Sequence, residues 1–409
     1  MHRFPRKLAV ALTGLALVAG ACGGGGGDKS ASAGAATKDP ITIGGIFALS
    51  GPTSDAGAPY ADGVKAYVDY LNTQGGGVEG HKVNFPNQDY KYEVPLAESA
   101  YQTYHDQGAV GIIGWGTADS EALRSRAAAD NMPFIGASYA APLADPKQAP
   151  YTFVPGPTYS NQMRMLLKYI SEQEKGAQTE VAFFHNKSPF GESPLADGKA
   201  YIKDNGLKMG FQSYAMVSTA NDYVPELTQA KAQSPKYIIV HSTAGPTSKL
   251  LQNIASQGLK VKVLGLNYCA DELTAKLAGP PAEGMLGINP YVQATGNEPE
   301  LAAAAKYLEA SGAKLADKPS KWIQGWNTAR VYFTGIGNAI KANGFDKFKD
   351  RATAGPLILK ALEEIKDFKT GVGPDVTFQS ENHSGMQAAP LVKLENGRLV
   401  KVQDALLTF

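Results

Sequence analysis

Short apolar runs alternate with amphipathic segments of helical length from residue 41 to about residue 290. In the first pair, ITIGGIF precedes a segment in which Val64, Tyr67, Val68 and Leu71 recur at the spacing of one helix face. Strands separated by helices of about 10–15 residues predict right-handed βαβ units and parallel sheets. The strands are too many for one modest sheet, and 409 residues suit about two domains. The chain is therefore predicted to be an α/β protein with two doubly wound parallel-sheet lobes.

The last third of the chain departs from this alternation. Three helical segments, over residues 300–312, 322–344 and 356–368, follow one another. Asn396-Gly397 then lies between two runs of alternating apolar residues, which predicts a β-hairpin with a type I′ turn.

The N-terminus has the features of a bacterial export signal. Basic residues precede an apolar stretch over residues 8–18, and small residues follow it, which is typical of a secretory signal peptide over residues 1–21. The small residues directly before Cys22 resemble the bacterial lipobox, which implies cleavage before Cys22 and diacylglycerol on its sulfur; plain secretion with cleavage near Ala21 is the alternative. Residues 22–39 are then predicted to be a lipidated cysteine and a flexible linker that tether the protein to a membrane.

Charge and composition exclude two other classes of protein. A net charge of +1 gives no basic face for nucleic acid, and after the first 25 residues no apolar run approaches the roughly 20 that span a bilayer. If Cys22 is acylated, Cys269 has no partner and is expected to be a small buried side chain. The exported protein is therefore expected to be stabilised by its core rather than by a disulfide.

The loops after the predicted strands are rich in Gly, Ser, Thr, Asn and Asp. In doubly wound sheets such loops lie beyond the carboxyl ends of the strands, where ligands bind. Many of their hydroxyls are expected to cap helices. Trp115 ends a strand, and an indole there suits a cleft wall because it combines apolar area with one donor. The stretch from Ser50 to Gly57 is predicted to form another wall of the cleft, with Gly51 letting the backbone turn close to the ligand.

Motifs for catalysis and for cofactors are absent from the sequence. There is no GxxxxGK[ST], GxSxG, HExxH or CxxC pattern. Gly114-Trp115-Gly116 begins a dinucleotide fingerprint, but Asp119 stands where a carboxylate would repel a pyrophosphate. A triad of Ser50, His241 and an aspartate stays open as an alternative, although the spacing does not support it. We expect no enzyme activity, no cofactor and no metal site.

Several of the loops together resemble those of a known family. FALSGPTSDAG, IIGWGTADS, PFIGASYAAPLAD and ENHSGMQ occur in the order and spacing of the branched-chain amino-acid-binding (Leu/Ile/Val-binding) proteins of ABC importers, which are type I periplasmic binding proteins. The resemblance runs from residue 41 to about residue 402. It implies a three-crossover hinge between the lobes, a ligand cleft between them and delivery of a small solute to a membrane permease. The implied lobes are residues 40–157 with 290–387, and residues 158–289 with 388–409.

The same resemblance assigns candidate ligand contacts. The family positions that meet the ligand carboxylate fall on Ala118, Ser138 and Ala140, so two of the three hydroxyls are missing. The acidic position that receives the ligand ammonium falls on Asn267. Aromatic wall positions fall on Ala56, Phe190, Thr243 and Trp326. Thr117 and Ser138 could supply hydroxyls in place of the missing ones. With Ser50 and Trp115 from the residues themselves, the candidate ligand-binding residues are Ser50, Ala56, Trp115, Thr117, Ala118, Ser138, Ala140, Phe190, Thr243, Asn267 and Trp326.

These departures leave the ligand class broad. Burying an ammonium without a carboxylate is costly, so Asp119, Asp271 or Glu272 would have to reach in for an amino acid to bind. The expected ligand is an amino acid, an aromatic or aliphatic acid, or an amide. The expected protein is a monomeric, exported, lipid-anchored substrate-binding protein that meets ABC permease subunits. The alternatives are a ligand sensor of the same fold and, less favoured, a secreted α/β hydrolase.

Overall fold

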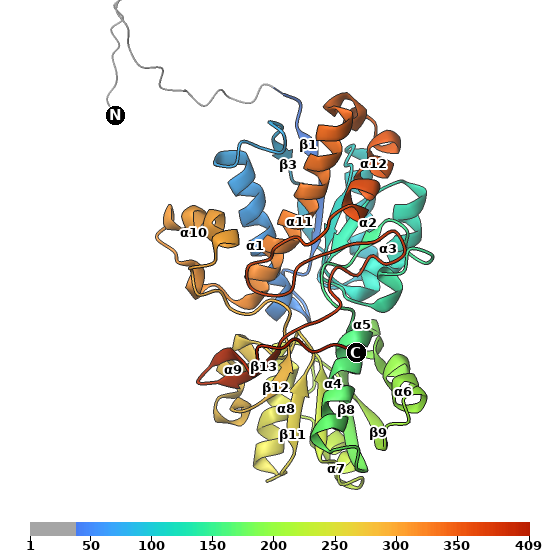
Figure 1. The fold of residues 1–409 in the computed structure, drawn as a ribbon, viewed down its shortest axis with the longest axis vertical. Coiled ribbons are helices and arrows are strands. Elements are labelled where there is room, and N and C mark those ends of the chain that lie inside the picture. The colour runs from blue at the N-terminus through green and yellow to red at the C-terminus, as the bar shows by residue number, and fades with distance from the viewer. Residues whose placement is uncertain (1–37) are drawn as a thin grey trace, which may run out of the picture. The chain divides into compact units, whose positions relative to one another are not determined.

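The computed structural model describes residues 38–409, and the predicted signal peptide and Cys22 lie outside the described residues. The described chain carries two main sheets, visible one above the other in Figure 1. Among its helices none is long and apolar enough to cross a membrane.

The first lobe is built on a five-stranded parallel sheet. Its strands, in spatial order, are β4 (Asn87–Asp89), β2 (Gly44–Phe47), β5 (Ile112–Gly114), β6 (Phe134–Gly136) and β7 (Thr152–Phe153). A separate parallel pair joins β1 (Ile41–Thr42) to β3 (Val83–Asn84). The helices of this part of the fold are α1 (Ser54–Thr73), α2 (Val94–Asp106), α3 (Thr117–Ala129), α10 (Ala302–Glu309), α11 (Ser320–Asn343) and α12 (Arg351–Glu363).

Two glycines bring α1 and α11 into close contact. A Cβ atom at Gly63 would lie 2.0 Å from the carbonyl oxygen of Trp322, and one at Gly325 would lie 2.0 Å from that of Tyr60. Each helix therefore packs its backbone directly against the other, which only glycine permits. This contact fixes α1, whose first turn faces the second lobe.

The second lobe is built on a seven-stranded mixed sheet. Its strands, in spatial order, are β14 (Arg398–Lys401), β13 (Leu391–Glu395), β12 (Leu286–Ile288), β11 (Lys262–Gly265), β10 (Tyr237–His241), β8 (Thr179–Asn186) and β9 (Met209–Met216). The pairs from β12 to β9 are parallel, whereas β13 and β14 are antiparallel to their neighbours. The helices are α4 (Tyr159–Gln173), α5 (Pro189–Glu192), α6 (Leu195–Asp204), α7 (Val224–Lys231), α8 (Ala244–Ser256) and α9 (Glu272–Ala278).

The chain passes between the two sheets three times: after β7, after β12 and before β13. The predicted α/β fold with two parallel-sheet lobes is confirmed, while the residue boundaries given for the lobes stay a prediction. The predicted hairpin is also confirmed, since Asn396 and Gly397 have φ values of 51° and 77° between β13 and β14, as a type I′ turn requires.

Candidate functional site

A narrow cavity of about 10 Å³, room for little more than one water molecule, lies where loops of the two lobes meet. It is bounded at the carboxyl ends of the parallel strands, which is the expected place for a ligand in this class of sheet. Both lobes contribute to its lining, which consists of Thr53, Tyr92, Trp115, Gly116, Thr117, Tyr159, Phe190, Thr243 and Tyr268.

The wall from the first lobe combines an indole with two hydroxyls. Trp115 follows β5 directly, and its Nε1 donates a hydrogen bond to Thr53 Oγ1 over 3.0 Å. Thr117 begins α3, and its Oγ1 lies 2.7 Å from Ser138 Oγ. Both hydroxyls are buried. Ser138 does not line the cavity itself, but its hydroxyl contacts Thr117, which does.

The wall from the second lobe is mainly aromatic. Tyr159 is the first residue of α4, Phe190 belongs to the short helix α5, and Tyr268 follows β11. The Phe190 ring meets Tyr159 edge-on at 5.4 Å between centroids, and Tyr268 meets Trp115 of the first lobe in the same way at 5.3 Å. Edge-to-face contacts of this kind hold aromatic walls in defined orientations.

Hydrogen bonds across the lobes accompany these ring contacts. Gln324 on α11 donates from Nε2 to the hydroxyls of both Tyr139 and Tyr268, each over 2.8 Å. The Tyr268 hydroxyl in turn donates to the Ala137 carbonyl oxygen over 2.5 Å. In this structure the lobes are therefore closed on each other around the cavity.

A carboxylate of α1 also crosses to the second lobe. The backbone N–H of Gly245, in the first turn of α8, donates to Asp55 Oδ2 over 2.9 Å. The other carboxylate oxygen is buried without a hydrogen-bond partner among the described residues. Burial raises the pKa of Asp55, and the Gly245 N–H and the Thr243 hydroxyl oppose that rise. Thr243 lines the cavity, so the Asp55 carboxylate lies at its margin.

The three acids that would have to reach into the cleft for an amino acid to bind make contacts elsewhere. Asp119 accepts from the Tyr90 hydroxyl over 2.8 Å, and burial raises the pKa of its carboxyl to about 6. Asp271 caps α9 by accepting from Thr274 N over 2.9 Å. Glu272 accepts from the Ser320 hydroxyl over 2.9 Å. None of the three carboxylates lines the cavity in the described part of the chain.

Asn267 lies beside the cavity in a buried polar cluster. Its backbone carbonyl accepts from Lys321 Nζ over 2.7 Å, and Lys321 lies 3.9 Å from Asp271. Both polar atoms of the Asn267 side chain are buried without a hydrogen-bond partner among the described residues. An unsatisfied buried amide is costly, although this side chain does not line the cavity.

The structure brings some of the sequence-predicted residues together and disperses the rest. Trp115, Thr117, Phe190 and Thr243 line the cavity. Ser138, Ala56, Ala140 and Asn267 are buried without lining it, and Ala118 is partly exposed on α3.

Ser50 and Trp326 lie away from the cavity. Ser50 is exposed, and its hydroxyl donates to Asp89 over 2.6 Å. The Trp326 indole is fully buried in the core, where it meets Tyr67 edge-on at 5.1 Å and stacks on Trp322. Trp322 and Trp326 are four positions apart and so share one face of α11. This spacing alone indicates core packing.

Five lining residues were not among the predicted contacts: Thr53, Tyr92, Gly116, Tyr159 and Tyr268. Thr53 lies within the stretch from Ser50 to Gly57 that was predicted as a cleft wall. Gly116 and Tyr268 are sequence neighbours of predicted residues in the same strand-end loops. Tyr159 follows a crossing between lobes, and Tyr92 follows an edge strand. No sequence pattern singles out either one.

The residues of the alternative hydrolase triad are not assembled. Ser50 is paired with Asp89 on the surface of the first lobe, whereas His241 is fully buried in β10 of the second lobe. Burial lowers the pKa of His241 to about 3, and neither ring nitrogen has a hydrogen-bond partner among the described residues. In residues 38–409 there is also no group of three or more side chains suited to a metal.

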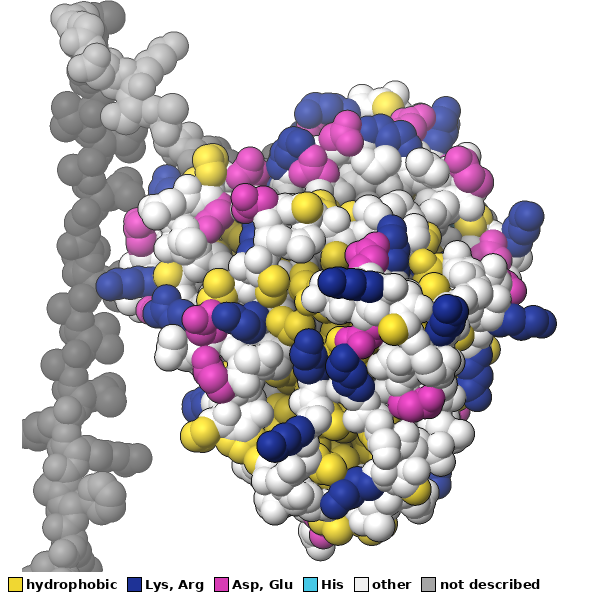
Figure 2. All heavy atoms as spheres, turned by 60° about the horizontal axis from the view of Figure 1, so that its bottom comes forward, with side chains coloured by type: hydrophobic (Ala, Val, Ile, Leu, Met, Phe, Trp, Pro, Cys, Tyr) yellow, Lys and Arg dark blue, Asp and Glu magenta, His cyan; other side chains and the backbone are white. Residues whose placement is uncertain are grey.

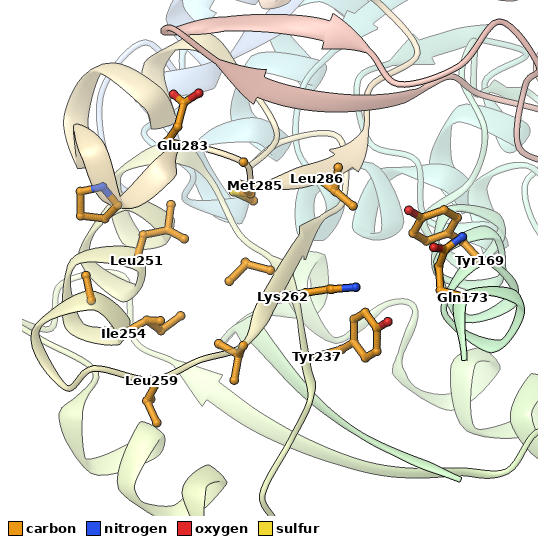
Figure 3. A pocket seen from close by; sticks show the side chains of 15 residues that line it. Tyr169, Gln173, Tyr237, Leu251, Ile254, Leu259, Lys262, Glu283, Met285 and Leu286 are labelled. Carbon is orange, nitrogen blue, oxygen red and sulfur yellow. The ribbon is translucent and has the colours of Figure 1, made fainter. Parts of the chain in front are cut away.

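A larger hollow of about 440 Å³ lies on the second lobe alone. Figure 3 shows Tyr169 and Gln173 on one side of β11 and Leu251 and Ile254 on the other. It opens at the amino ends of the strands, since Tyr237 and Lys262 are the first residues of β10 and β11. On the face seen in Figure 2, hydrophobic surface shows between separate basic side chains, with acidic ones among them. The interlobe cavity, at the carboxyl ends, is the better candidate site.

Comparisons with known proteins agree with the fold. A family model described as periplasmic binding protein matches residues 40–398. The Leu/Ile/Val-binding protein of Escherichia coli K12 is 24% identical over 356 residues, which cover 82% of this chain and 91% of that protein. A structure titled as a branched-chain amino acid ABC transporter from Thermus thermophilus with bound valine has a TM-score of 0.82 at 24% identity, covering 91% of this chain and 97% of the other. A solute binding protein of R. palustris in complex with benzoate has a TM-score of 0.75 at 19% identity, covering 90% and 97%.

Proposed function

The chain belongs to the periplasmic binding protein family, a family of binding proteins rather than enzymes, and on that basis we propose that it is the solute-capturing component of an ABC importer. The observation that carries the proposal is the cavity between the lobes, since it is closed by residues from both. A solute held there bridges the lobes, so binding and closure are coupled. The closed form is then the one that an ABC permease receives.

The lining supports a small organic solute with an apolar body. Five of the lining side chains are aromatic, namely Tyr92, Trp115, Tyr159, Phe190 and Tyr268, and none of the described lining side chains is charged. The hydroxyls of Thr53, Thr117 and Thr243 provide polar contacts at fixed points. This pairing of aromatic surface with neutral donors favours an aromatic or aliphatic acid, or an amide.

An amino acid is the second candidate, and one observation favours it. Asp55 lies at the margin of the cavity with one carboxylate oxygen buried and unpartnered among the described residues. A ligand ammonium is the group that would satisfy that oxygen. Asp55 would then supply the negative charge that Asn267, at the family's acidic position, does not carry.

A matched pair of ligands separates the two candidates. Phenylalanine and 3-phenylpropanoate, and likewise leucine and 4-methylpentanoate, differ only by the amine. An acid-binding site binds the member without the amine more tightly, and Asp55→Asn leaves that preference unchanged. An amino-acid site binds the zwitterion more tightly, and Asp55→Asn removes most of its affinity. The proposal of a solute site fails if no member of a panel of amino acids, organic acids and amides raises the melting temperature, since a ligand of the folded state stabilises it.

The position in the cell is part of the same proposal. Export by the signal over residues 1–21 and a lipid on Cys22 would hold the binding domain at the outer face of the cytoplasmic membrane or in the periplasm, with residues 22–39 as the tether. Expression of the full chain and of Cys22→Ala tests this. The lipid-bearing protein sediments with membranes, and Cys22→Ala is released in soluble form if the anchor is real.

A further inference from the structure

Tyr92 occupies an unusual place in the lining of the interlobe cavity. The other lining side chains are buried, with exposed fractions between 1% and 5%, and Gly116 is buried as well. Tyr92 alone among the described lining residues is partly exposed. Tyr92 is therefore the lining residue that reaches the surface of the protein.

The Tyr92 ring lies against the start of α3. A Cβ atom placed on Gly116 would be 2.6 Å from Cε2 of Tyr92, so a residue with a side chain at 116 would push the ring away. The Tyr90 ring lies beside it, at 6.0 Å between centroids. Tyr92 thus covers the N-terminal end of α3 next to Thr117, which faces the cavity.

The backbone that places this ring is strained. Lys91 and Tyr92 have φ values of 57° and 65°, so two consecutive residues other than glycine adopt the left-handed conformation. Such a conformation is unfavourable for side chains of this size and persists only where surrounding contacts enforce it.

The enforcing contacts come from Asp89, at the end of β4. Its Oδ1 accepts from the backbone N–H groups of Leu49 and Lys91, each over 2.9 Å, and of Ser50 over 3.3 Å. Its Oδ2 accepts from the Ser50 hydroxyl over 2.6 Å. One carboxylate therefore ties the loop before α1 to the loop that carries Tyr92.

Gly51 lets these two loops approach each other. It has a φ of 86°, and a Cβ atom there would lie 2.4 Å from the Lys91 carbonyl oxygen. The predicted role of Gly51 was to let the backbone approach the ligand, whereas here it lets one loop approach another. Ser50 and Gly51 thus act on the cavity through the Tyr92 loop rather than by touching a ligand.

We propose that Tyr92 is a specificity-determining residue that limits the length of the solute, and that Asp89 is the residue that positions it. The inference rests on the proposed function, because it takes the interlobe cavity as the solute site. With the ring in place a ligand has to end at Tyr92, and without it a longer ligand extends to solvent through the same opening.

The experiment compares Tyr92→Gly with Tyr92→Phe. Glycine tolerates the left-handed backbone and removes the ring, whereas phenylalanine keeps the ring and removes only the hydroxyl. Benzoate, 3-phenylpropanoate and 5-phenylpentanoate serve as probes of increasing length in calorimetric titrations. We expect Tyr92→Gly to shift the affinity ratio of the longest to the shortest probe by about tenfold or more toward the longest. Tyr92→Phe should keep the wild-type ratio, and an unchanged ratio in Tyr92→Gly overturns the inference.

A second experiment tests whether Asp89 positions Tyr92. Asp89→Ala removes the acceptor from all four donors but leaves Tyr92 in place, and Ser50→Ala removes one donor. We expect Asp89→Ala to shift the length ratio in the same direction as Tyr92→Gly, with Ser50→Ala closer to wild type. A lower melting temperature with an unchanged length ratio would mean that Asp89 only supports the fold, which contradicts the positioning role.

Acrylamide quenching of tryptophan fluorescence measures access from solvent to the cavity in the absence of ligand. Trp322 and Trp326 are buried on α11 and serve as a constant background, so a change reports Trp115. We expect quenching to rise in Tyr92→Gly but not in Tyr92→Phe. If no probe binds the wild type while quenching rises in this way, the cover is real and the proposed acid ligand is wrong. If quenching is the same in both variants, Tyr92 is not the cover.

Discussion

The carboxylate of Asp55 on α1 accepts a hydrogen bond from the backbone N–H of Gly245 on α8, 2.9 Å away. The two residues belong to different lobes and are 190 positions apart in the chain. This contact exists only when the lobes are closed, so it stabilises the closed form relative to the open one. It is the polar counterpart of the ring contact between Trp115 and Tyr268.

Removal of this acceptor is predicted to weaken solute binding. Asp55→Ala leaves the Gly245 N–H without its partner on closure, and an unmade buried hydrogen bond costs about 1–3 kcal/mol. We therefore expect affinity for the best ligand of the panel to fall by about tenfold, measured by calorimetry. Small-angle scattering at a saturating ligand concentration should show a smaller closed fraction. Equal affinity and equal compaction in wild type and Asp55→Ala would show that the contact does not contribute to closure.

The contact between Trp115 and Thr53 is predicted to matter for stability as well as for the cavity. Thr53→Val keeps the shape of the side chain but leaves the buried indole N–H of Trp115 without an acceptor. We expect a loss of about 1–3 kcal/mol in the free energy of unfolding, measured with denaturant. Thr53→Ser keeps the hydroxyl and is the matched control, so similar losses in the two variants would contradict the hydrogen-bond explanation.

Close packing of α1 on α11 predicts a sharp contrast between two glycines of one helix. Gly325→Ala would place a Cβ 2.0 Å from the Tyr60 carbonyl oxygen, whereas the nearest atoms to a Cβ at Gly337 are 3.6 Å away. We expect Gly325→Ala to lower the free energy of unfolding by about 1–3 kcal/mol or more. Gly337→Ala should be neutral or stabilising by up to about 1 kcal/mol, because alanine favours a helix over glycine. Equal effects in thermal unfolding would refute the close contact.

The buried carboxyl of Asp119 is predicted to make the free energy of unfolding depend on pH. Burial raises its pKa in the folded protein to about 6, compared with about 3.9 in an unfolded chain. The folded protein therefore holds this proton more tightly. The stability that Asp119 contributes is fully present below about pH 4 and is lost as the pH rises to about 6. By pH 7 the loss amounts to about 3 kcal/mol.

Asp119→Asn isolates this component. Unfolding free energies of wild type and Asp119→Asn are compared at pH 4 and pH 7, because other groups titrate in both proteins alike. We expect the wild type to lose stability relative to the variant between these two values. A difference that stays constant with pH would mean that the Asp119 carboxyl titrates normally.

The fold was predictable because it depends on patterns that repeat along the chain. Alternating strands and helices gave the two α/β lobes, and Asn396-Gly397 gave the hairpin through a local backbone requirement. Trp115 was predictable as a cavity wall, since its position at the end of a buried strand determines where it points. Thr117, Phe190 and Thr243 also line the cavity and lie at or near helix starts, but they were assigned through the resemblance.

Other parts of the site depend on contacts that no local pattern records. Tyr92 reaches the cavity because Asp89 holds two loops together, and that contact joins residues 39 and 40 positions apart. Ser50 was assigned to the ligand because its loop lies near the cleft, but its hydroxyl turns to Asp89 instead. Trp326 was assigned through a resemblance, although its spacing from Trp322 already indicated the core. At 24% identity, a relative indicates which loops surround the cleft better than it indicates which side chains of those loops face it.

A crystal structure of the exported part of the chain, grown with the ligand that gives the largest thermal shift, would show where that ligand binds. We expect electron density for that ligand between the lobes, in contact with Trp115, Phe190 and Tyr268. Density in the hollow between Tyr169 and Leu251 instead, with the interlobe cavity filled only by protein side chains, would contradict it.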